Sequence, residues 1–415
     1  MLRAFALYVA LMISVIVALI CGSLLTLYYL NDQEYYIYET DARLRSNVES
    51  AFNWVRENEI KEGTLVKDLF GENRDSVELK VRSWGLFNLI TAKAFSGSRS
   101  KEKSALLGPL PHHKDEYALY MGNSNKALSL CGRTSIVGKV FVPEAGVERA
   151  YIEGQNFIGD KLINGKQKTS GSALPELKKE VMDNIGKYLK GEKMEGDSLR
   201  EFSKDSTKII QSFGKNALFL NSSAPIVLEN IELKGKIIIR SSEWVQIKKS
   251  ALLEDVLIFA PFIFIDDHFS GSGQFYASDS LLVGEDCKLN YPSVLALVNY
   301  SGTDHSTLLK VGEGTKLQGA VFSYQEKQGI HSKNNLILSK DTEVYGQVYS
   351  NGYLELQGEV FGSVVCAQFL LKTPSSVYEN HLLNATIDIS QLPKGFVGFY
   401  LLKEDTQFEI SKWLN

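Results

Sequence analysis

The residues best suited to chemistry form a short polar run, Asp266-Asp267-His268, directly after the apolar segment Phe262-Ile-Phe-Ile265. Two carboxylates on one face of a sheet can protonate a glycosidic oxygen and activate a water molecule, or can bind calcium. The sequence lacks the companions of such a site: there is no Gly-His-Gly, no Arg-x-Lys after an apolar strand and no second carboxylate pair in comparable β context. Since Gly271-Ser-Gly273 follows, the run favours a corner whose side chains bind turn amides. We therefore predict no catalytic residue, with Asp266, Asp267 and His268 as the candidates if there is one.

The other histidines stand in loop-like surroundings. His112-His113 lies between Pro111 and a charged run, where it could hold a metal or simply be part of a solvated loop. Asp304-His305 and His331 are isolated in turn-like sequence. These positions do not predict a metal site.

The four cysteines do not form a pattern either. One lies in the apolar N-terminus and three are far apart in sequence, which fits neither a disulfide framework nor a metal spacing: Cys21, Cys131, Cys287 and Cys366. The sequence has no Gly-rich phosphate loop and no nucleophile elbow. We predict no metal, no cofactor and no enzyme activity.

A repeated pattern indicates the framework that holds these side chains. Thr315–Ser323 and Thr342–Ser350, offset by 27 residues, both read Thr-x-apolar-x-Gly-x-Val-aromatic-Ser. A degenerate third pass spans Leu354–Val365, the segment Thr134–Val142 fits eight of the nine positions, and Ile231–Ile239 is a looser copy. Extended chain with such a period is typical of a parallel β-helix, or β-solenoid, although the motif could also recur by chance in a β-rich chain. If the early copy belongs to the same stack, the chain must leave that stack and rejoin it.

The periodicity changes inside this region. Leu174–Leu189 begins with a proline and then places apolar residues at helical spacing, which predicts one inserted helix. The following charged segment, residues 190–207, is expected to be an exposed excursion. The fold class is therefore mainly β: a parallel β-helix with an N-terminal transmembrane helix, a small α+β layer and one inserted helix.

The N-terminus predicts a membrane span. Residues 4–30 contain no charged side chain, a run that as helix is about 40 Å long and exceeds the roughly 30 Å of a hydrocarbon core. A cleaved signal peptide or a lipoprotein at Cys21 would need a shorter apolar region or small residues before the cysteine. Arg3 precedes the span and acidic residues follow it, so the positive-inside rule places the N-terminus in the cytoplasm and the body outside it.

The helix is expected to continue beyond the span. In residues 31–60, apolar side chains recur at spacings that put them on one helical face, namely Ile37, Leu44, Val48, Ala51, Phe52 and Val55. The net charge of the whole chain is −4, and omitting the first thirty residues, whose only charge is Arg3, changes it to −4 − 1 = −5. Without a basic excess, nucleic acid is excluded as an expected partner.

Two family resemblances follow from these segments. The span running into Asp41-Ala-Arg-Leu-Arg-Ser-Asn-Val-Glu-Ser-Ala51 resembles the membrane helix and first ectodomain helix of PilX-like minor pilins and pseudopilins. The glycine turns of residues 315–371 are similar to the polymer-forming β-helix of bactofilins. The chain departs from the pilin pattern because nothing acidic occurs between Met1 and Leu30. The pilin resemblance implies pilus or secretion assembly subunits as protein partners.

These inferences give a domain plan and a function. The plan is an anchor (1–30), an amphipathic helix (31–60), a small β layer (61–130), a β-solenoid with a helical insertion at 174–190 (131–391) and a C-terminal cap (392–415). The predicted function is a non-enzymatic, envelope-tethered assembly protein, minor pilin-like, that presents a rigid solenoid to partner subunits. The alternative is a surface-anchored β-helix that binds or cleaves carbohydrate. A third possibility, end-to-end polymerisation as in bactofilins, is opposed by the apparent cap at Phe408–Leu414.

Overall fold

The protein is mainly β with one long N-terminal helix. The computed structural model describes residues 2–58, 62–71, 75–110, 117–203, 207–300, 306–327, 333–399, 401–402 and 408–414, with side chains from residue 5 onward. These residues divide into two compact units, one of residues 1–80 and 91–103 and the other of residues 81–90 and 104–415. The boundaries between the two units fall within strands.

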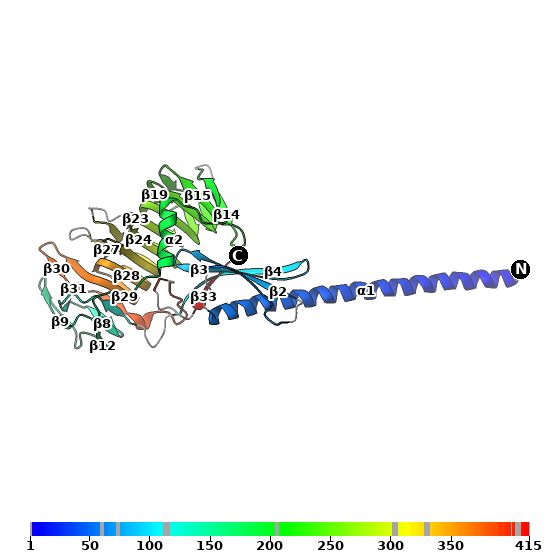
Figure 1. Cartoon of the computed structure of the whole chain (residues 1–415), viewed down its shortest axis with the longest axis horizontal. Coiled ribbons are helices and arrows are strands. Elements are labelled where there is room, and N and C mark those ends of the chain that lie inside the picture. Colours follow the sequence, from blue (N-terminus) through cyan, green and yellow to red (C-terminus); the bar gives the residue numbers. More distant parts are fainter. Residues whose placement is uncertain are drawn as a thin grey trace. The chain divides into compact units, whose positions relative to one another are not determined.

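In the first unit, helix α1 (Leu2–Glu57) runs unbroken for 56 residues, or about 84 Å (Figure 1). Helix-favouring Ala and Leu are frequent, and the segment contains no proline. Every side chain from residue 5 to residue 39 is exposed, and Thr40 is the first buried one. The apolar face predicted beyond it is confirmed from Leu44 to Val55, whereas Ile37 is exposed. One helix therefore has two parts with different surroundings.

Polar contacts fix the second part of α1 within this unit. Asp41 pairs with Arg99 at 3.4 Å and with Lys101 at 2.8 Å. Arg43 binds Asp75 at 2.9 Å. The lysine hydrogen bond holds the pKa of the Asp41 carboxyl below its usual value, and both cations add to this effect. The carboxylate is thus most favourable in its charged form while the helix is docked.

A five-stranded sheet joins the first four strands of the chain to the last one, which pairs antiparallel with the fourth. Strand alternation is clear in Val77, Leu79 and Val81, which are buried between more exposed polar residues. The last strand returns to the fourth, where Phe408 pairs with Pro109. Residues 110–407 are therefore an insertion between two paired strands. The sheet has the order β1 (Gly63–Lys67), β2 (Ser76–Trp84), β3 (Phe87–Ser96), β4 (Arg99–Pro109), β33 (Phe408–Leu414).

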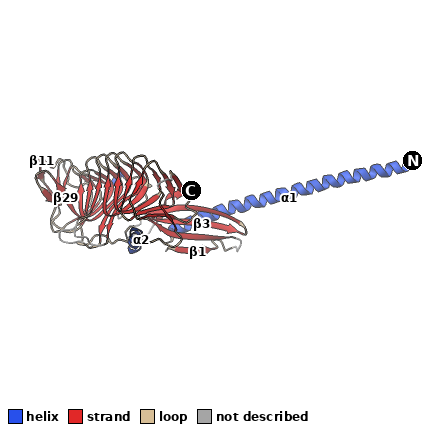
Figure 2. Ribbon diagram, turned by 90° about the horizontal axis from the view of Figure 1, so that it is seen from above, coloured by secondary structure: helices blue, strands red, loops and turns tan. Residues whose placement is uncertain are grey.

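The insertion is built mostly from parallel strands that lie side by side (Figure 2). They form one hydrogen-bonded set that contains closed rings of strands and has β12 (Gln167–Thr169) and β13 (Ser198–Glu201) as its terminal strands, and we call this set the closed sheet. Its strand pairs are parallel apart from β29 with β30. The members are β5 (Leu119–Met121), β7 (Ser135–Val137), β8 (Val140–Val142), β12 (Gln167–Thr169), β13 (Ser198–Glu201), β15 (Leu218–Ser222), β16 (Ile226–Leu228), β18 (Ile237–Ser241), β19 (Trp244–Ile247), β21 (Val256–Ile265), β22 (Ser270–Gly271), β23 (Gly273–Val283), β24 (Lys288–Asn299), β25 (Leu308–Val311), β26 (Lys316–Gln325), β27 (Asn335–Leu338), β28 (Glu343–Leu356), β29 (Glu359–Lys372), β30 (Val377–Glu379) and β32 (Thr386–Asp388).

Smaller groups of strands complete the insertion. One group is the antiparallel pair β10 (Tyr151–Ile152) and β11 (Gln155–Asn156). Two three-stranded parallel sheets have the orders β14 (Lys208–Gln211), β17 (Glu232–Gly235), β20 (Leu252–Glu254) and β31 (His381–Leu383), β6 (Leu128–Cys131), β9 (Val147–Arg149). A short 3₁₀ turn, η1, spans Ile389–Gln391.

The repeat seen in the sequence is a direct pairing in the structure. Lys316–Ser323 lies residue for residue beside Glu343–Ser350, and the third pass joins them through Gly362, which pairs with Gly346. Gly346 has φ +147°, and a Cβ there would lie 1.9 Å from the carbonyl oxygen of Gly319. The motif needs glycine because successive backbones meet at this position. The looser copy, Ile231–Ile239, is out of register with the motif. Its alignment would place Ile237 in line with Val321, but successive strand pairings place Ile239 there.

The early copy of the motif, Thr134–Val142, contributes strands to the closed sheet. Leu119 of β5 pairs on one side with Val364 and on the other with Val140. Ile136 of β7 reaches the stack through Ile387 of β32. Three short strands at the start of the insertion therefore extend the sheet beyond its last long strand. The domain plan assigns residues 61–130 to the small β layer, but β5 belongs to the closed sheet. A strand of three residues carries too little sequence pattern to show which sheet it joins.

The inserted helix α2 (Lys179–Lys190) begins five residues later than predicted. Lys178 is extended and its N–H binds the carbonyl of Leu401 at 2.8 Å, while Leu177 bridges Leu402. This tertiary pairing uses the residues that sequence alone would assign to the first helical turn. The helix ends at Gly191 in a left-handed conformation, and its apolar face joins the outer side of the closed sheet.

Two segments near the closed sheet lack regular pairing with their neighbours in the chain. The segment of residues 396–399 is irregular, because Phe396 contacts the rings of Tyr291 and Phe399. The short strands β5 and β6 do not pair with each other, since β5 pairs with β29 and β6 pairs with β31. The predicted cap, Phe408–Leu414, is strand β33 of the five-stranded sheet.

Candidate functional site

A surface groove crosses the ends of three successive strands of the closed sheet. It is lined by Glu229, Trp244, Gln246, Lys248, Phe264 and Asp266, among others. Alternation on each strand positions these side chains, since Val245, Ile247, Ile263 and Ile265 point into the core and their neighbours point outward. The groove therefore follows from the same periodicity that builds the core.

The parallel register brings the aromatic residues of this region together. Trp244 pairs with Phe262, and Gln246 pairs with both Val227 and Phe264. Phe262 is 41% exposed, and Trp244 and Phe264 are partly exposed. The outer face of β19 and β21 thus carries three aromatic side chains next to a polar edge.

Asp266 is held at that polar edge. Its Oδ1 accepts a hydrogen bond of 2.8 Å from Gln246 Nε2, and its Oδ2 lies 3.1 Å from Lys248 Nζ. Both oxygens face donors, so the carboxylate acts as an acceptor and orients the amide and the ammonium group. Sequence reasoning selected Asp266 but neither of these partners.

Asp267 and His268 lie in the corner that the sequence favoured. Asp267 Oδ1 accepts the backbone N–H of Glu285 at 2.8 Å, an approach that requires Gly284 because a Cβ there would lie 2.3 Å from that oxygen. His268 has φ +60°, and its Nδ1 is 3.8 Å from Asp286 in an exposed pair. These contacts stack one turn on the next.

The remaining candidates do not add to this site. His112, His113, Asp304, His305 and His331 lie outside the described residues. Within the described residues, no cluster of His, Cys, Asp and Glu could hold a metal ion.

The cysteines away from the N-terminus are buried thiols. Burial raises the pKa of Cys366 and of Cys287, which disfavours the nucleophilic thiolate. Cys287 Sγ instead donates to the carbonyl oxygen of Asp266 at 3.2 Å. These cysteines fill the core rather than form a reactive site.

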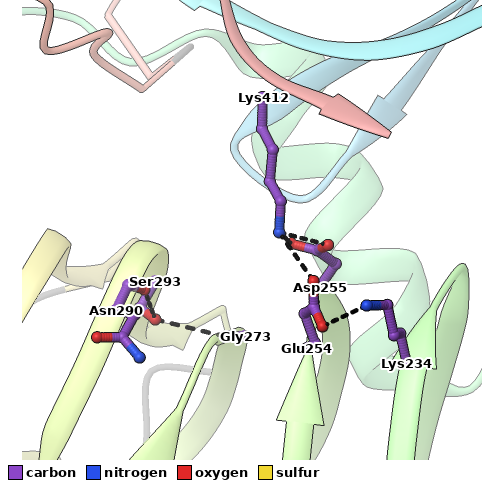
Figure 3. Close-up of polar contacts among 7 residues, drawn as sticks. All are labelled: Lys234, Glu254, Asp255, Gly273, Asn290, Ser293 and Lys412. Atoms are coloured by element: carbon purple, nitrogen blue, oxygen red, sulfur yellow. Dashed lines mark hydrogen bonds and ion pairs between the residues drawn. The ribbon is translucent and has the colours of Figure 1, made fainter. Parts of the chain in front are cut away.

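A second polar cluster was missed by sequence reasoning. Lys412 of β33 reaches Asp255 and Glu254, and Lys234 binds the other oxygen of Glu254 at 2.7 Å (Figure 3). Asp255 adopts φ +61° between β20 and β21, a conformation that Asp tolerates better than most residues. Neighbouring Ser411 also binds the hydroxyl of Tyr291 at 2.6 Å, and burial raises the pKa of that tyrosine to about 12. The cluster fastens the returning strand.

The groove is the better candidate for contact with another molecule. The fastening cluster is satisfied internally, whereas the groove presents rings and polar groups at an accessible surface. Asp266 accepts a hydrogen bond from Gln246, and Asp267 accepts one from the backbone N–H of Glu285. The groove thus combines partly exposed rings with polar groups that are held by hydrogen bonds.

Comparisons with known proteins place few constraints on the chain. No family model matches it, and no curated protein is similar to it. A solved structure to which it is similar is that of the competence-associated pilin ComZ from Thermus thermophilus. The identity is 13% and the TM-score is 0.22, over 91% of this chain and 97% of the other.

Proposed function

We propose that this chain is a non-enzymatic, envelope-tethered assembly protein, in which a minor pilin-like helix carries a parallel β-helix that presents its surface to partner subunits. The helix would span a bacterial inner membrane once, with the N-terminus in the cytoplasm and the body outside. The partners would be subunits of a pilus or secretion assembly.

The observation that carries the proposal is the change of environment along α1. From Phe5 onward the helix has a segment with a mean hydropathy of 2.6, none of it buried, while its last turns pack inside the first unit. An apolar helix of this length left uncovered in water would aggregate, so lipid or other helices must surround it. A helix that is shared between a membrane and a folded body suits an assembly subunit.

The proposal that the closed sheet is a parallel β-helix is supported by unbroken columns of inward side chains. Parallel pairing at intervals of 16 to 27 residues brings Leu295, Val321, Val348 and Val364 into line, each at most 1% exposed. The recurring threonines add a second column. Thr315 and Thr342 are fully buried and donate to backbone carbonyls of the preceding turn at 2.9 and 3.1 Å. Such a body is rigid and offers an extended face.

The ends of the stack oppose bactofilin-like polymerisation. The column that contains Val321 ends in a polar side chain at both ends, Arg200 of β13 and Gln167 of β12, and both are exposed. Polar and charged residues on an edge discourage pairing with another chain. We therefore favour contacts through α1 and the sides of the body over end-to-end growth.

A helix exchange tests the proposal. The full-length protein and a variant in which residues 4–30 are replaced by an unrelated membrane helix of equal length would be cross-linked in the native membrane. The captured proteins would then be identified by mass spectrometry. We expect the parent to capture pilin-like or secretion subunits through residues 4–56 and the variant to remain membrane-bound without capturing them. Equal capture by both forms, or capture by neither, would contradict the proposal.

A further inference from the structure

We propose that the groove at Trp244 and Phe264 binds a neutral polysaccharide chain. The proposal goes beyond assembly and does not depend on it. Its basis is the combination of open aromatic rings, an oriented set of hydrogen-bonding groups and a nearly balanced charge in one accessible groove.

The rings are available to a ligand. Trp244, Phe262 and Phe264 come from two adjacent strands and share the outward face. Among the residues that the structure describes, none of the three rings stacks on another ring or on a cation. Trp244 and Phe264 are partly exposed and Phe262 is exposed, so these flat apolar rings can contact the C–H faces of a pyranose. The strands beneath hold the rings in place, which limits the entropic cost of binding.

The polar groups are already oriented. Asp266 holds Gln246 through a contact of 2.8 Å and Lys248 through a contact of 3.1 Å. These contacts fix the orientation of the Gln246 amide and of the Lys248 ammonium group. An amide, an ammonium group and a carboxylate at one edge supply both donors and acceptors for hydroxyl groups. A purely apolar partner would leave these groups desolvated at a cost.

Charge and shape favour a neutral, extended ligand. Three carboxylates and two lysines line the groove: Glu229, Asp266, Asp267, Lys248 and Lys249. There is no positive excess to attract a polyanion. Because the lining comes from three successive strands spaced about 4.8 Å apart, the groove runs across the stack for roughly 10 Å. A linear chain can lie along it.

The contacts of the carboxylates indicate binding without cleavage. Asp266 is paired with Lys248, and Asp267 is occupied by the amide of Glu285. A glycosidase of the usual kind needs one carboxyl group kept protonated beside the glycosidic oxygen and a second one to act on the sugar or on water. Neither carboxylate is arranged for the first task.

Affinity electrophoresis of the full-length protein tests the site. The native gels would contain hydroxyethyl cellulose, dextran, a soluble β-1,3-glucan or glycol chitin, with polygalacturonate as the anionic control. A polyoxyethylene detergent is required, because glucoside and maltoside head groups would compete. The variants are Trp244→Ala, Phe264→Ala, the ring-preserving Trp244→Phe and a matched control, Tyr151→Ala, whose ring is 67% exposed on β10.

We expect at least one neutral polysaccharide to retard the parent, and the two alanine variants at the groove to bind about tenfold more weakly. Tyr151→Ala should bind like the parent, and Trp244→Phe should lie between the parent and Trp244→Ala. Retardation by polygalacturonate alone, retention unaffected by both alanine variants, or no retardation in any neutral gel would overturn the proposal. Shortening of the polysaccharide would overturn the exclusion of cleavage. The helix-exchange variant should bind normally, so this test and the assembly test fail independently.

Discussion

Lys412 Nζ lies 2.7 and 2.8 Å from the two carboxylate oxygens of Asp255, although the two residues are 157 positions apart in sequence. The lysine belongs to β33, which pairs with β4, and the aspartate belongs to a turn of the inserted body. The ion pair therefore fastens the returning end of the chain to the body from which it emerges.

Replacing Lys412 should destabilise the protein, because it leaves the buried carboxylate of Asp255 without its cation. Burial is the largest influence on Asp255 and raises its pKa, while the hydrogen bond from Lys412 opposes the rise. We expect Lys412→Met to lower the free energy of unfolding by about 1–3 kcal/mol at neutral pH, measured by urea denaturation. The matched control is Lys234→Met, whose exposed pair with Glu254 should change it by less than about 1 kcal/mol.

The same variant should have a distinctive pH dependence. A carboxyl group whose pKa is raised by folding binds protons more readily in the folded state, so its contribution to stability falls as the pH rises from the usual value of 3.8 through the raised pKa. Without Lys412 the pKa should rise further. The deficit of Lys412→Met should therefore shrink as the pH is lowered toward 4. A deficit independent of pH would show that the lysine acts through packing alone.

The stacked glycines should not tolerate a methyl group. In Gly346→Ala the new Cβ would meet the carbonyl oxygen of Gly319 at 1.9 Å, in a backbone conformation of φ +147°. We expect a loss of about 3 kcal/mol or more, seen as a lower thermal midpoint or as failure to fold. Gly395→Ala, where nothing lies within 4 Å, is the control and should be neutral. Similar effects at both positions would contradict the stacking argument.

Replacing the buried threonines should destabilise the protein in proportion to the number of hydrogen bonds that each hydroxyl group makes. Thr315 Oγ1 donates to Gly284 and also accepts the N–H of Cys287 at 3.1 Å, whereas Thr342 Oγ1 donates to Gly312. Valine keeps the shape and removes the hydroxyl. We expect Thr315→Val to lower the free energy of unfolding by about 1–2 kcal/mol and Thr342→Val to lower it by less. The reverse order in chemical denaturation would argue against this account.

Acid should loosen the contact between α1 and the strands of the first unit. The hydrogen bond from Lys101 and the charges of Lys101 and Arg99 lower the pKa of Asp41, so its stabilising contribution is present above the usual value of 3.8 and is lost as the pH falls through the lowered pKa. We expect amide hydrogen exchange in residues 41–55, corrected for intrinsic rates, to rise over that range in the parent. Asp41→Asn should show faster exchange already at neutral pH and a weaker dependence on acid. If the parent and Asp41→Asn showed the same exchange at every pH, the ion pairs of Asp41 would not contribute to the packing of α1.

The sequence by itself determined the features that depend on local periodicity. The apolar run of residues 4–30 and the apolar face from Leu44 to Val55 are carried by single helical stretches, and they gave the helix that the structure contains. The two copies of the motif, Thr315–Ser323 and Thr342–Ser350, pair in the register that their alignment predicts, because glycine is required where the backbones at Gly319 and Gly346 meet. The corner at Asp267 was also foreseeable from turn chemistry.

Only the tertiary structure decided the features that depend on partners distant in the chain. The late start of α2 follows from the bond between Lys178 and Leu401, and the place of β33 follows from its pairing with β4. The groove arises because Trp244 and Phe264 lie on neighbouring strands that parallel register brings side by side. Hydrophobic pattern fixes which face of a strand is buried, but not which strand is its neighbour, and for this reason the pairings and the groove could not be read in advance.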